Sequence, residues 1–429
     1  MGWNENSHIV SFLPLLCFCL SFSIVSFLPT CLPLFLPPPP RYTTTAAAEG
    51  DDKEPTLQTM TCVQFADAEA VVGTINGDIY RFKLDEQTGS FDLIGQIPGE
   101  NCHSGPINSM HAGAGVLVTA GDDGKVKRFA VDEGRLQDDV IAELDLKDAE
   151  RYNCLNPRLR SVCLKSDLKT MLVAARSGDV YEIAEGGDMT SDDPLVQGHF
   201  DREVWALAVH PKEREFCTGG EDKTLRVWSY DQHRQLCMVK VDCMIRSACY
   251  SPDLNHIAIG LGGEPDERRG EKTVDGSIGQ FKVFERKVAE DGTMSLEVVF
   301  EERHSKQTIY DIKYSPDGES LAVAAGDNIY FYDVEQQYKH TKTFKKHKMP
   351  ITHFDFSSES DFIISNCQGG DVFFADAHTG GHIPSPAELK DVDWSTWTVC
   401  NGWASMGVHT PYKDGSVVNA VARSESRKL

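Results

Sequence analysis

Short runs of alternating hydrophobic and polar residues cover most of the chain from about residue 56 to its end. The runs are rich in Val, Ile, Phe and Tyr, and turns containing Gly, Asp, Pro or Ser separate them. Alternation with a period of two is typical of β-strands that bury one face. We therefore expect this region to be all-β.

The strand pattern recurs as a unit along the chain. Each copy has a strand, a turn rich in Pro, Asp or Ser, a second strand, a Gly/Asp turn and a third strand that ends in an aromatic or apolar residue, and a fourth strand fits before the next copy. The strongest copies begin about 40 to 45 residues apart, which is the period of a four-stranded propeller blade of the WD40 type. The seven complete copies begin at Met60, His103, Leu159, Gly198, Met244, His304 and His347.

The copy "GHFDREVWALAVHPKEREFCTGGEDKTLRVWS" contains a histidine, a threonine and an aspartate that could form a hydroxyl-His-Asp catalytic set. In WD-type blades the same residue types, with a tryptophan of the third strand, form a buried hydrogen-bonded chain that ties the blade together. The positions here are His199, Thr218, Asp222 and Trp228.

A second copy nearly repeats this set, at His103, Thr119, Asp123 and Phe129. A third copy retains Ser365 but has Gly369 and Ala375 where the aspartate and the tryptophan would stand. An enzyme needs a catalytic set only once, whereas this set recurs in a second copy and has lost members in a third. We interpret it as structural and expect no catalytic residues.

Other chemical motifs are absent from the sequence. It has no GxxxxGK[ST] loop, no HExxH and no GxSxG, and its 13 cysteines lack the spacing of a zinc site. We therefore expect a protein that is not an enzyme and that holds no cofactor and no metal, with reduced cysteines. His210, which precedes a proline in a strand-end turn, is interpreted as a surface residue.

The chain is strongly acidic, with 42 basic and 65 acidic residues and a net charge of -23. Such a surface repels phosphate backbones and anionic membranes. We expect protein partners, no nucleic acid and no small-molecule substrate.

Residues 1–55 are hydrophobic and proline-rich, and they do not share the strand alternation. Three interpretations remain open: a membrane segment at residues 9–36, a divergent signal peptide, or a gene-model artefact that is foreign to the native protein. The run "PPPP" at 37–40 cannot pair inside a sheet. We expect residues 1–50 to contribute nothing to the propeller fold.

The C-terminal stretch from residue 347 resembles the echinoderm microtubule-associated protein-like (EMAP-like) family, and the resemblance extends over about residues 56–429. The block "KDVDWSTWTVCNGWASMGVHTPYKDGSVVNAVARSESRKL" carries its most specific part. The matching residues are Asp391, Trp394, Trp397, Gly407, Val408, Asp414, Gly415, Asn419, Ala420 and Arg423.

This resemblance implies two joined β-propellers. Residues 56–197 would be the last blades of a first propeller, and 198–429 an incomplete second propeller, truncated at its C-terminal end. The alternative is a single seven-bladed ring from 56 to about 390. The chain lacks the basic region and the coiled coil that the family pattern places before its propellers, so we expect it to be a fragment of a longer gene product.

The resemblance also implies a non-enzymatic scaffold of a microtubule-associated protein, in the cytoplasm on the microtubule cytoskeleton. Tubulin is acidic, so this acidic chain is expected to bind microtubules weakly by itself. The alternative function is a WD-repeat adaptor or substrate receptor in an unrelated complex, such as a ubiquitin ligase.

One position of the first strand of each copy collects residue types that dominate interface hot spots. Thr61, Asn108 and Arg160 stand there in the first three copies, and Trp205, Arg246, Tyr310 and Thr352 stand there in the next four. We predict that the last four mark a partner surface; the alternative is that Trp205 and Tyr310 only fill space between blades. Residues 262–279, rich in charge and glycine, are predicted to form a surface loop.

Overall fold

The computed structural model describes residues 59–402, except 86, 88, 114, 167–168 and 264–276, together with 418 and 420–422. The predictions for residues 1–50 and for most of the loop at 262–279 lie outside the described residues. So do Gly407, Val408, Asp414, Gly415, Asn419 and Arg423 of the C-terminal block.

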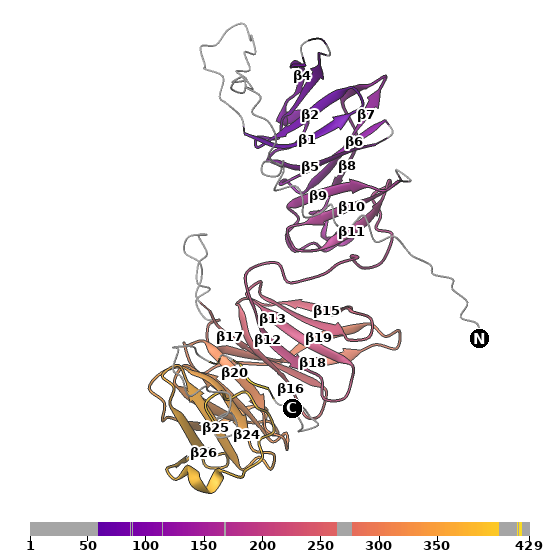
Figure 1. The fold of residues 1–429 in the computed structure, drawn as a ribbon. Coiled ribbons are helices and arrows are strands. Elements are labelled where there is room, and N and C mark those ends of the chain that lie inside the picture. Colours follow the sequence, from indigo (N-terminus) through magenta and orange to yellow (C-terminus); the bar gives the residue numbers. More distant parts are fainter. Residues whose placement is uncertain are drawn as a thin grey trace, which may run out of the picture. The chain divides into compact units, whose positions relative to one another are not determined.

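The described residues form seven antiparallel sheets in which the strands follow one another in chain order (Figure 1). We number the sheets 1 to 7. Sheet 1 contains β1 (Met60–Ala66), β2 (Glu69–Thr74), β3 (Ile79–Leu84) and β4 (Phe91–Ile97). Sheet 2 contains β5 (Ile107–Gly113), β6 (Val116–Gly121), β7 (Lys125–Asp132) and β8 (Arg135–Asp145). Sheet 3 contains β9 (Leu159–Leu164), β10 (Thr170–Ala175) and β11 (Val180–Ala184).

The remaining sheets each have four strands. Sheet 4 contains β12 (Val204–Val209), β13 (Glu215–Gly220), β14 (Thr224–Ser229) and β15 (Arg234–Lys240). Sheet 5 contains β16 (Ile245–Tyr250), β17 (His256–Leu261), β18 (Gln280–Val288) and β19 (Met294–Arg303). Sheet 6 contains β20 (Ile309–Tyr314), β21 (Ser320–Ala325), β22 (Asn328–Asp333) and β23 (Lys339–Phe344). Sheet 7 contains β24 (Ile351–Phe356), β25 (Phe362–Cys367), β26 (Val372–Asp376) and β27 (His382–Ile383).

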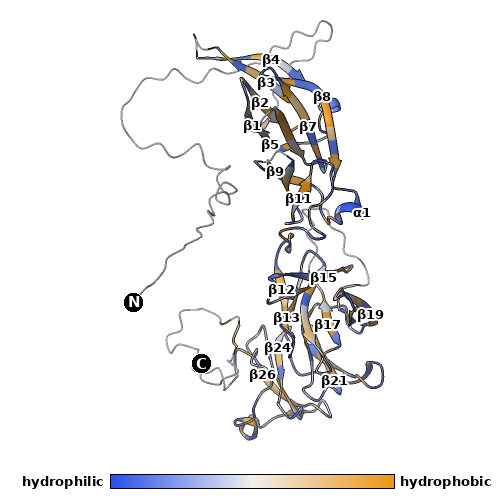
Figure 2. Cartoon of the chain, turned by 90° about the vertical axis from the view of Figure 1, so that its right-hand side faces the viewer, coloured by the Kyte–Doolittle hydropathy of each residue, from blue (hydrophilic) through white to orange (hydrophobic). Residues whose placement is uncertain are grey.

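Helical structure is short in the described part of the chain. It consists of α1 (Ala149–Tyr152) and the 3-10 turns Gly99–Asn101 and Pro386–Leu389. Hydrophobic and hydrophilic positions alternate along most strands in Figure 2, whereas α1 is hydrophilic. The prediction of an all-β chain built from repeated strand units is confirmed.

Sheet 3 departs from the expected four strands. After β11 the chain "EGGDMTSDDPLVQ" lacks alternation, and Pro194 has no N–H to donate to a ladder. Only two isolated bridges form there, Val180 with Val196 and Ile183 with Met189. The place of a fourth strand is therefore taken by turns.

The core lies between consecutive sheets. First strands pack on one another in two rows, β1, β5 and β9 in one row, and β12, β16, β20 and β24 in the other. Clusters of buried aliphatic and aromatic side chains fill the spaces between neighbouring sheets within each row. Because burial of apolar surface is the main favourable term in folding, each sheet depends on its neighbour for stability.

His210 is not the surface residue that the sequence predicted, because it is buried beside β12. Its Nδ1 accepts hydrogen bonds from the backbone amides of Lys212 (3.2 Å) and Glu213 (2.8 Å). Its ring packs edge-on against Tyr250, with 4.9 Å between the ring centroids. The imidazole thus satisfies turn amides that the loop leaves without backbone partners.

None of the ten described cysteines, between Cys62 and Cys400, is in a disulfide bond. Burial raises the pKa of Cys217 and of Cys102 to about 12. A thiol with a raised pKa carries little thiolate, so these cysteines behave as small apolar core residues. Among the described residues there is no helix long and apolar enough to cross a bilayer.

Candidate functional site

Sheet 4 brings the four predicted residues of the blade chain together. His199 Nδ1 lies 2.9 Å from Asp222 Oδ2, and its Nε2 lies 2.7 Å from Thr218 Oγ1. Trp228 Nε1 donates to the same hydroxyl oxygen at 2.7 Å. An ionised carboxylate only accepts, so Nδ1 carries the imidazole proton and Nε2 accepts from the threonine hydroxyl.

Two further residues that the sequence analysis missed extend this chain. Thr224 donates to Asp222 through its backbone amide (3.1 Å) and its hydroxyl (2.8 Å). Arg226 Nε in turn donates to Thr224 Oγ1 at 3.1 Å. Burial by itself raises the pKa of the Asp222 carboxyl, but the hydrogen bonds from His199 and Thr224 outweigh it and hold that pKa below its usual range.

Sheet 2 contains the second predicted set with one link missing. His103 Nδ1 lies 3.0 Å from Asp123 Oδ1, and its Nε2 lies 2.7 Å from Thr119 Oγ1. Phe129 is fully buried at the tryptophan position but has no N–H to donate. In sheet 2 no indole N–H reaches the hydroxyl of Thr119, which lies 3.4 Å from the backbone oxygen of Lys127.

Sheet 7 retains only the contact between the histidine and the hydroxyl. His347 Nε2 lies 2.8 Å from Ser365 Oγ. His347 Nδ1 is buried without a hydrogen-bond partner in the described part of the chain, since Gly369 supplies no carboxylate. Burial lowers the pKa of the His347 imidazole to about 4.

These hydroxyls are poorly placed for nucleophilic attack. Both His103 and Thr119 are buried, and in sheet 4 the Thr218 oxygen already has two close nitrogen neighbours. A catalytic hydroxyl must approach a substrate carbonyl to within about 3 Å. The geometry suits a tie between strands, and this structural role stays a prediction that the stability measurements below test.

The seven aligned first-strand residues, which include the four predicted partner residues, occupy the same structural position in their sheets. Each is skipped by the pairing register between the first and the second strand, as at Val204/Ala206 around Trp205 and at Ile245/Ser247 around Arg246. The same one-residue shift occurs in the other five first strands, at Thr61, Asn108, Arg160, Tyr310 and Thr352. A residue skipped in this way forms a β-bulge, which redirects its side chain.

Two of the four predicted partner residues lie in contact. The guanidinium of Arg246 lies 4.8 Å from the centre of the Trp205 ring, and its Nη2 lies 2.7 Å from Glu221 Oε1. Trp205 remains 53% exposed. Stacking and the ion pair hold the exposed indole over a guanidinium whose side chain is only 13% exposed.

The other bulge residues differ in what they contact. Thr61 Oγ1 donates to the backbone oxygen of Ile107, and Asn108 Nδ2 donates to that of Leu159 at 2.7 Å, so both bind the next sheet. Tyr310 and Thr352 are half-buried. The exposure of Trp205 does not fit the alternative that it only fills space between blades, whereas for the half-buried Tyr310 that alternative stays open.

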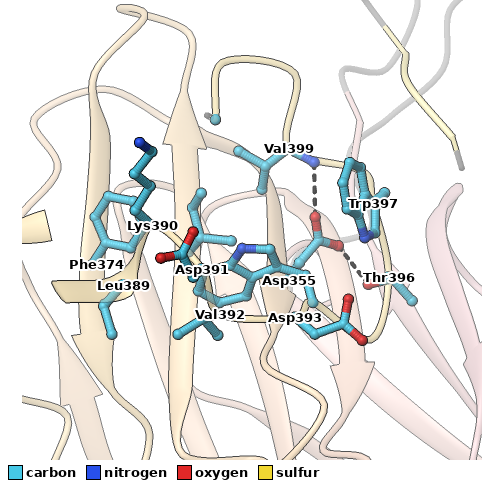
Figure 3. Close-up of a pocket in the computed structure, with 13 residues that line it drawn as sticks. Asp355, Phe374, Leu389, Lys390, Asp391, Val392, Asp393, Thr396, Trp397 and Val399 are labelled. Atoms are coloured by element: carbon cyan, nitrogen blue, oxygen red, sulfur yellow. Dashed lines mark hydrogen bonds between the residues drawn. The ribbon is translucent and has the colours of Figure 1, made fainter. Parts of the chain in front are cut away.

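Asp355 organises the C-terminal extension of sheet 7 (Figure 3). Its carboxylate accepts hydrogen bonds from the backbone amides of Thr398 (2.7 Å) and Val399 (2.9 Å) and from the hydroxyls of Thr396 and Thr398. Lys313 Nζ lies 3.2 Å from the same carboxylate and 2.8 Å from Asp311. Burial lowers the pKa of Lys313, but the two carboxylates outweigh it and the net shift is upward.

A cavity of about 430 Å³ lies between sheet 7 and this extension. Leu389, Phe374 and Trp394 contribute apolar surface, and Lys390, Asp391 and Asp393 add charged groups to its wall (Figure 3). Asp391, Trp394 and Trp397 of the C-terminal block thus gather in one place. The described residues contain no group of three or more His, Cys, Asp or Glu side chains that could hold a metal ion.

Comparison with known proteins identifies the architecture. Residues 204–429 match the family model of the echinoderm microtubule-associated protein second beta-propeller. The chain is 28% identical over 363 residues to the 77 kDa echinoderm microtubule-associated protein of Lytechinus variegatus, covering 83% of this chain and 48% of that protein.

Two mammalian relatives are similar to a comparable degree. Human echinoderm microtubule-associated protein-like 2 is 31% identical over 251 residues, which cover 58% of this chain and 35% of the relative. Mouse echinoderm microtubule-associated protein-like 1 is 27% identical over 384 residues, which cover 88% and 42%. The chain thus spans about half the length of the relatives that it matches over most of its residues.

The matched model covers more than half of the chain, and the repeated four-stranded sheets are those of WD40-type propeller blades. The predicted fold class and the predicted family are both confirmed. This chain belongs to the echinoderm microtubule-associated protein family.

Proposed function

We propose that this chain is a non-enzymatic scaffold that acts in the cytoplasm on the microtubule cytoskeleton through the bulge surface of sheets 4 to 7. This bulge surface consists of Trp205, Arg246, Tyr310 and Thr352. The observation that carries the proposal is the common register: a bulge in every first strand turns one variable side chain out of the ladder. The names of the relatives support a microtubule-associated role.

Two domain boundaries belong to this proposal. Residues 56–197 form the last blades of one propeller and 198–429 belong to a second propeller, while 1–55 stand outside both. The start of the family match at residue 204 supports the division.

The net negative charge of the chain affects how it can bind microtubules. The net charge of -23 opposes association with acidic surfaces, so binding must depend on local contacts such as the cation and the indole at Arg246 and Trp205. Arginine and aromatic side chains supply most of the free energy at protein interfaces. The acidic field also predicts that added salt strengthens microtubule binding until it screens the repulsion.

Co-sedimentation of the full chain with taxol-stabilised microtubules tests the proposal. We expect measurable pelleting, and a weakening of about tenfold in the Arg246→Ala/Tyr310→Ala variant, the equivalent of ~1.4 kcal/mol. Arg214→Ala is the matched control, because Arg214 is an exposed arginine off the bulge positions. Equal melting temperatures establish that each variant folds.

Equal pelleting of the double variant and the wild type would move the site away from the bulge surface. No pelleting, together with capture of ubiquitin-ligase subunits by the wild type, would favour the adaptor function instead.

A further inference from the structure

One ring nitrogen of His347 in sheet 7 lacks the partner that sheet 4 provides. The Nε2 of His347 contacts Ser365 Oγ at 2.8 Å. In sheet 4 the Nε2 of His199 contacts Thr218 in the same way, and its Nδ1 faces the Asp222 carboxylate. The two rings therefore have the same orientation, and Nδ1 of His347 points to the place of that carboxylate. It is buried there without a hydrogen-bond partner in the described part of the chain.

The tautomer of His347 follows from its neighbours. No acceptor faces Nδ1, whereas Nε2 lies against Ser365 Oγ, whose own proton is directed to the backbone oxygen of Phe373 at 3.4 Å. The ring proton is therefore on Nε2. Burial lowers the pKa of His347 to about 4, so the imidazole is neutral at physiological pH. Its Nδ1 then holds an unshared electron pair, as a metal ligand must.

Cys367 brings a thiol to the same place. It holds the register position of Gly220 in sheet 4, opposite the residue before the bulge. A Cβ added to Gly220 would lie 3.1 Å from His199 Nδ1 and 3.2 Å from Asp222 Oδ1. The side chain of Cys367 therefore starts between the imidazole and the place that the carboxylate takes in sheet 4.

Met349 adds a thioether. Gly369 stands at the position of the missing aspartate, and a Cβ added there would lie 3.6 Å from Cys367 Sγ and 3.3 Å from Met349 Cγ. Both sulfur-bearing side chains thus flank the place where the carboxylate would start. His347 and Cys367 are buried, whereas Met349 is 47% exposed, so its flexible side chain reaches the place from the solvent side.

The three donors suit monovalent copper. Soft thiolate and thioether ligands select Cu(I), whereas structural zinc takes four ligands from Cys, His, Asp and Glu. On binding, the thiol releases its proton to solvent, and the resulting thiolate neutralises Cu(I). A divalent ion would leave a net positive charge in a buried place where Gly369 supplies no carboxylate, and an uncompensated buried charge is costly.

We propose that His347 Nδ1, Cys367 Sγ and Met349 Sδ form a binding site for monovalent copper in sheet 7. The metal takes the place of the carboxylate of sheet 4 and gives Nδ1 the partner that it lacks. It thereby ties the loop before β24 to the end of β25. The expectation of a chain without metal rested on zinc spacings, which do not include methionine. The inference does not depend on microtubule binding.

Anaerobic titration of the full, reduced chain with Cu(I), in competition with the coloured chelator bicinchoninate, tests the proposal. We expect the wild type to hold one more equivalent of Cu(I) than the Cys367→Ser variant. Cys400→Ser is the matched control, because Cys400 and Cys367 are both only 3% exposed. It should retain this equivalent. Equal melting temperatures of the copper-free proteins establish that the variants fold.

Two further variants test the other donors. Loss of a group that only supports a metal ligand weakens metal binding by about 10- to 100-fold. We expect at least about a 100-fold loss in His347→Gln and about a tenfold loss in Met349→Leu, which keeps an apolar side chain of similar size. Because Met349 is exposed, its variant keeps the test readable if His347→Gln does not fold. X-ray absorption of the copper-loaded chain should show one nitrogen and two sulfur ligands, and one sulfur fewer in Met349→Leu.

A wild type that holds no more Cu(I) than Cys367→Ser overturns the proposal, as does an equal loss in Cys400→Ser. Full binding by both His347→Gln and Met349→Leu would also overturn it, because the thiol would then act without the other two donors. Zinc held more tightly than Cu(I) by the same residues would overturn the assignment to copper.

Discussion

Sheets 4 and 7 hold their histidines in the same position but treat the second ring nitrogen differently. In sheet 4, Nδ1 of His199 faces the Asp222 carboxylate at 2.9 Å. In sheet 7, Nδ1 of His347 is buried without a partner in the described part of the chain, because Gly369 replaces the aspartate. We therefore expect the carboxylate to decide whether burial of the imidazole stabilises the sheet or makes it sensitive to acid.

The largest expected difference between the two sheets is in how acid changes the free energy of unfolding. The pKa of His347 is about 4 in the folded chain and about 6.5 when unfolded, so the unfolded state takes up the proton first. The contribution of His347 is therefore complete above pH ~6.5 and is lost as the pH falls toward 4, by up to about 3 kcal/mol.

Urea unfolding at several pH values between 7 and 4 measures this loss against a His347→Gln variant, whose side chain does not titrate. The difference in unfolding free energy between the two proteins should change with pH in this window. A constant difference would contradict the lowered pKa of His347.

Removal of the carboxylate should make sheet 4 resemble sheet 7. Asp222→Ala leaves His199 Nδ1 and the Thr224 hydroxyl without their acceptor, so we expect a loss of about 2 kcal/mol in unfolding free energy. Asp231→Ala is the control, because the pair of Asp231 with Arg214 is exposed and should matter by less than about 0.5 kcal/mol. Equal effects of the two substitutions in thermal melts would argue against a stabilising role for the hydrogen-bonded set around Asp222.

Introducing the missing carboxylate should stabilise sheet 7. Gly369→Asp places a carboxylate at the register position of Asp222, and an added Cβ meets the flexible Met349 side chain at 3.3 Å. We expect a gain of about 1 kcal/mol and an upward shift of the His347 pKa, which NMR titration of the imidazole measures. Gly369→Asn, which brings an acceptor without a charge, should leave that pKa closer to 4.

The smallest effect should come from the tryptophan. Trp228→Phe removes the donor to Thr218 Oγ1 and so reproduces the shorter chain of sheet 2, where Phe129 stands. We expect a loss of about 0.5 kcal/mol. Trp205→Phe, at an exposed ring outside the chain, is the comparison for thermal melts.

Local sequence patterns were enough to predict residues whose partners stand at the same sequence spacing in several copies of the repeat. Alternation and turn residues gave the strands, and the recurring offsets gave the sets around His199 and His103. The alignment of first strands also found the bulge position, although nothing in the sequence distinguishes a bulge from a paired residue.

Contacts between distant segments escaped prediction for a physical reason. Asp355 binds residues 396–399, more than 40 positions later in the chain, and no periodicity connects them. His210 was misplaced because an imidazole that accepts backbone amides has the same local sequence as one in solvent. In sheet 3, a proline and polar residues replaced an expected strand with turns.

In this repeat fold the bulge separates two kinds of residue. Paired residues in the ladder maintain the sheet, and the skipped residue can change. A residue that the ladder skips makes no cross-strand pair, so replacing it leaves the register of its sheet intact. Seven such positions already hold Thr, Asn, Arg, Trp and Tyr. Thr61, Asn108 and Arg246 make contacts within the fold. Randomising an exposed position such as Trp205 would vary a surface on an unchanged backbone, and a protein built this way can acquire new partners by mutation without first losing its fold.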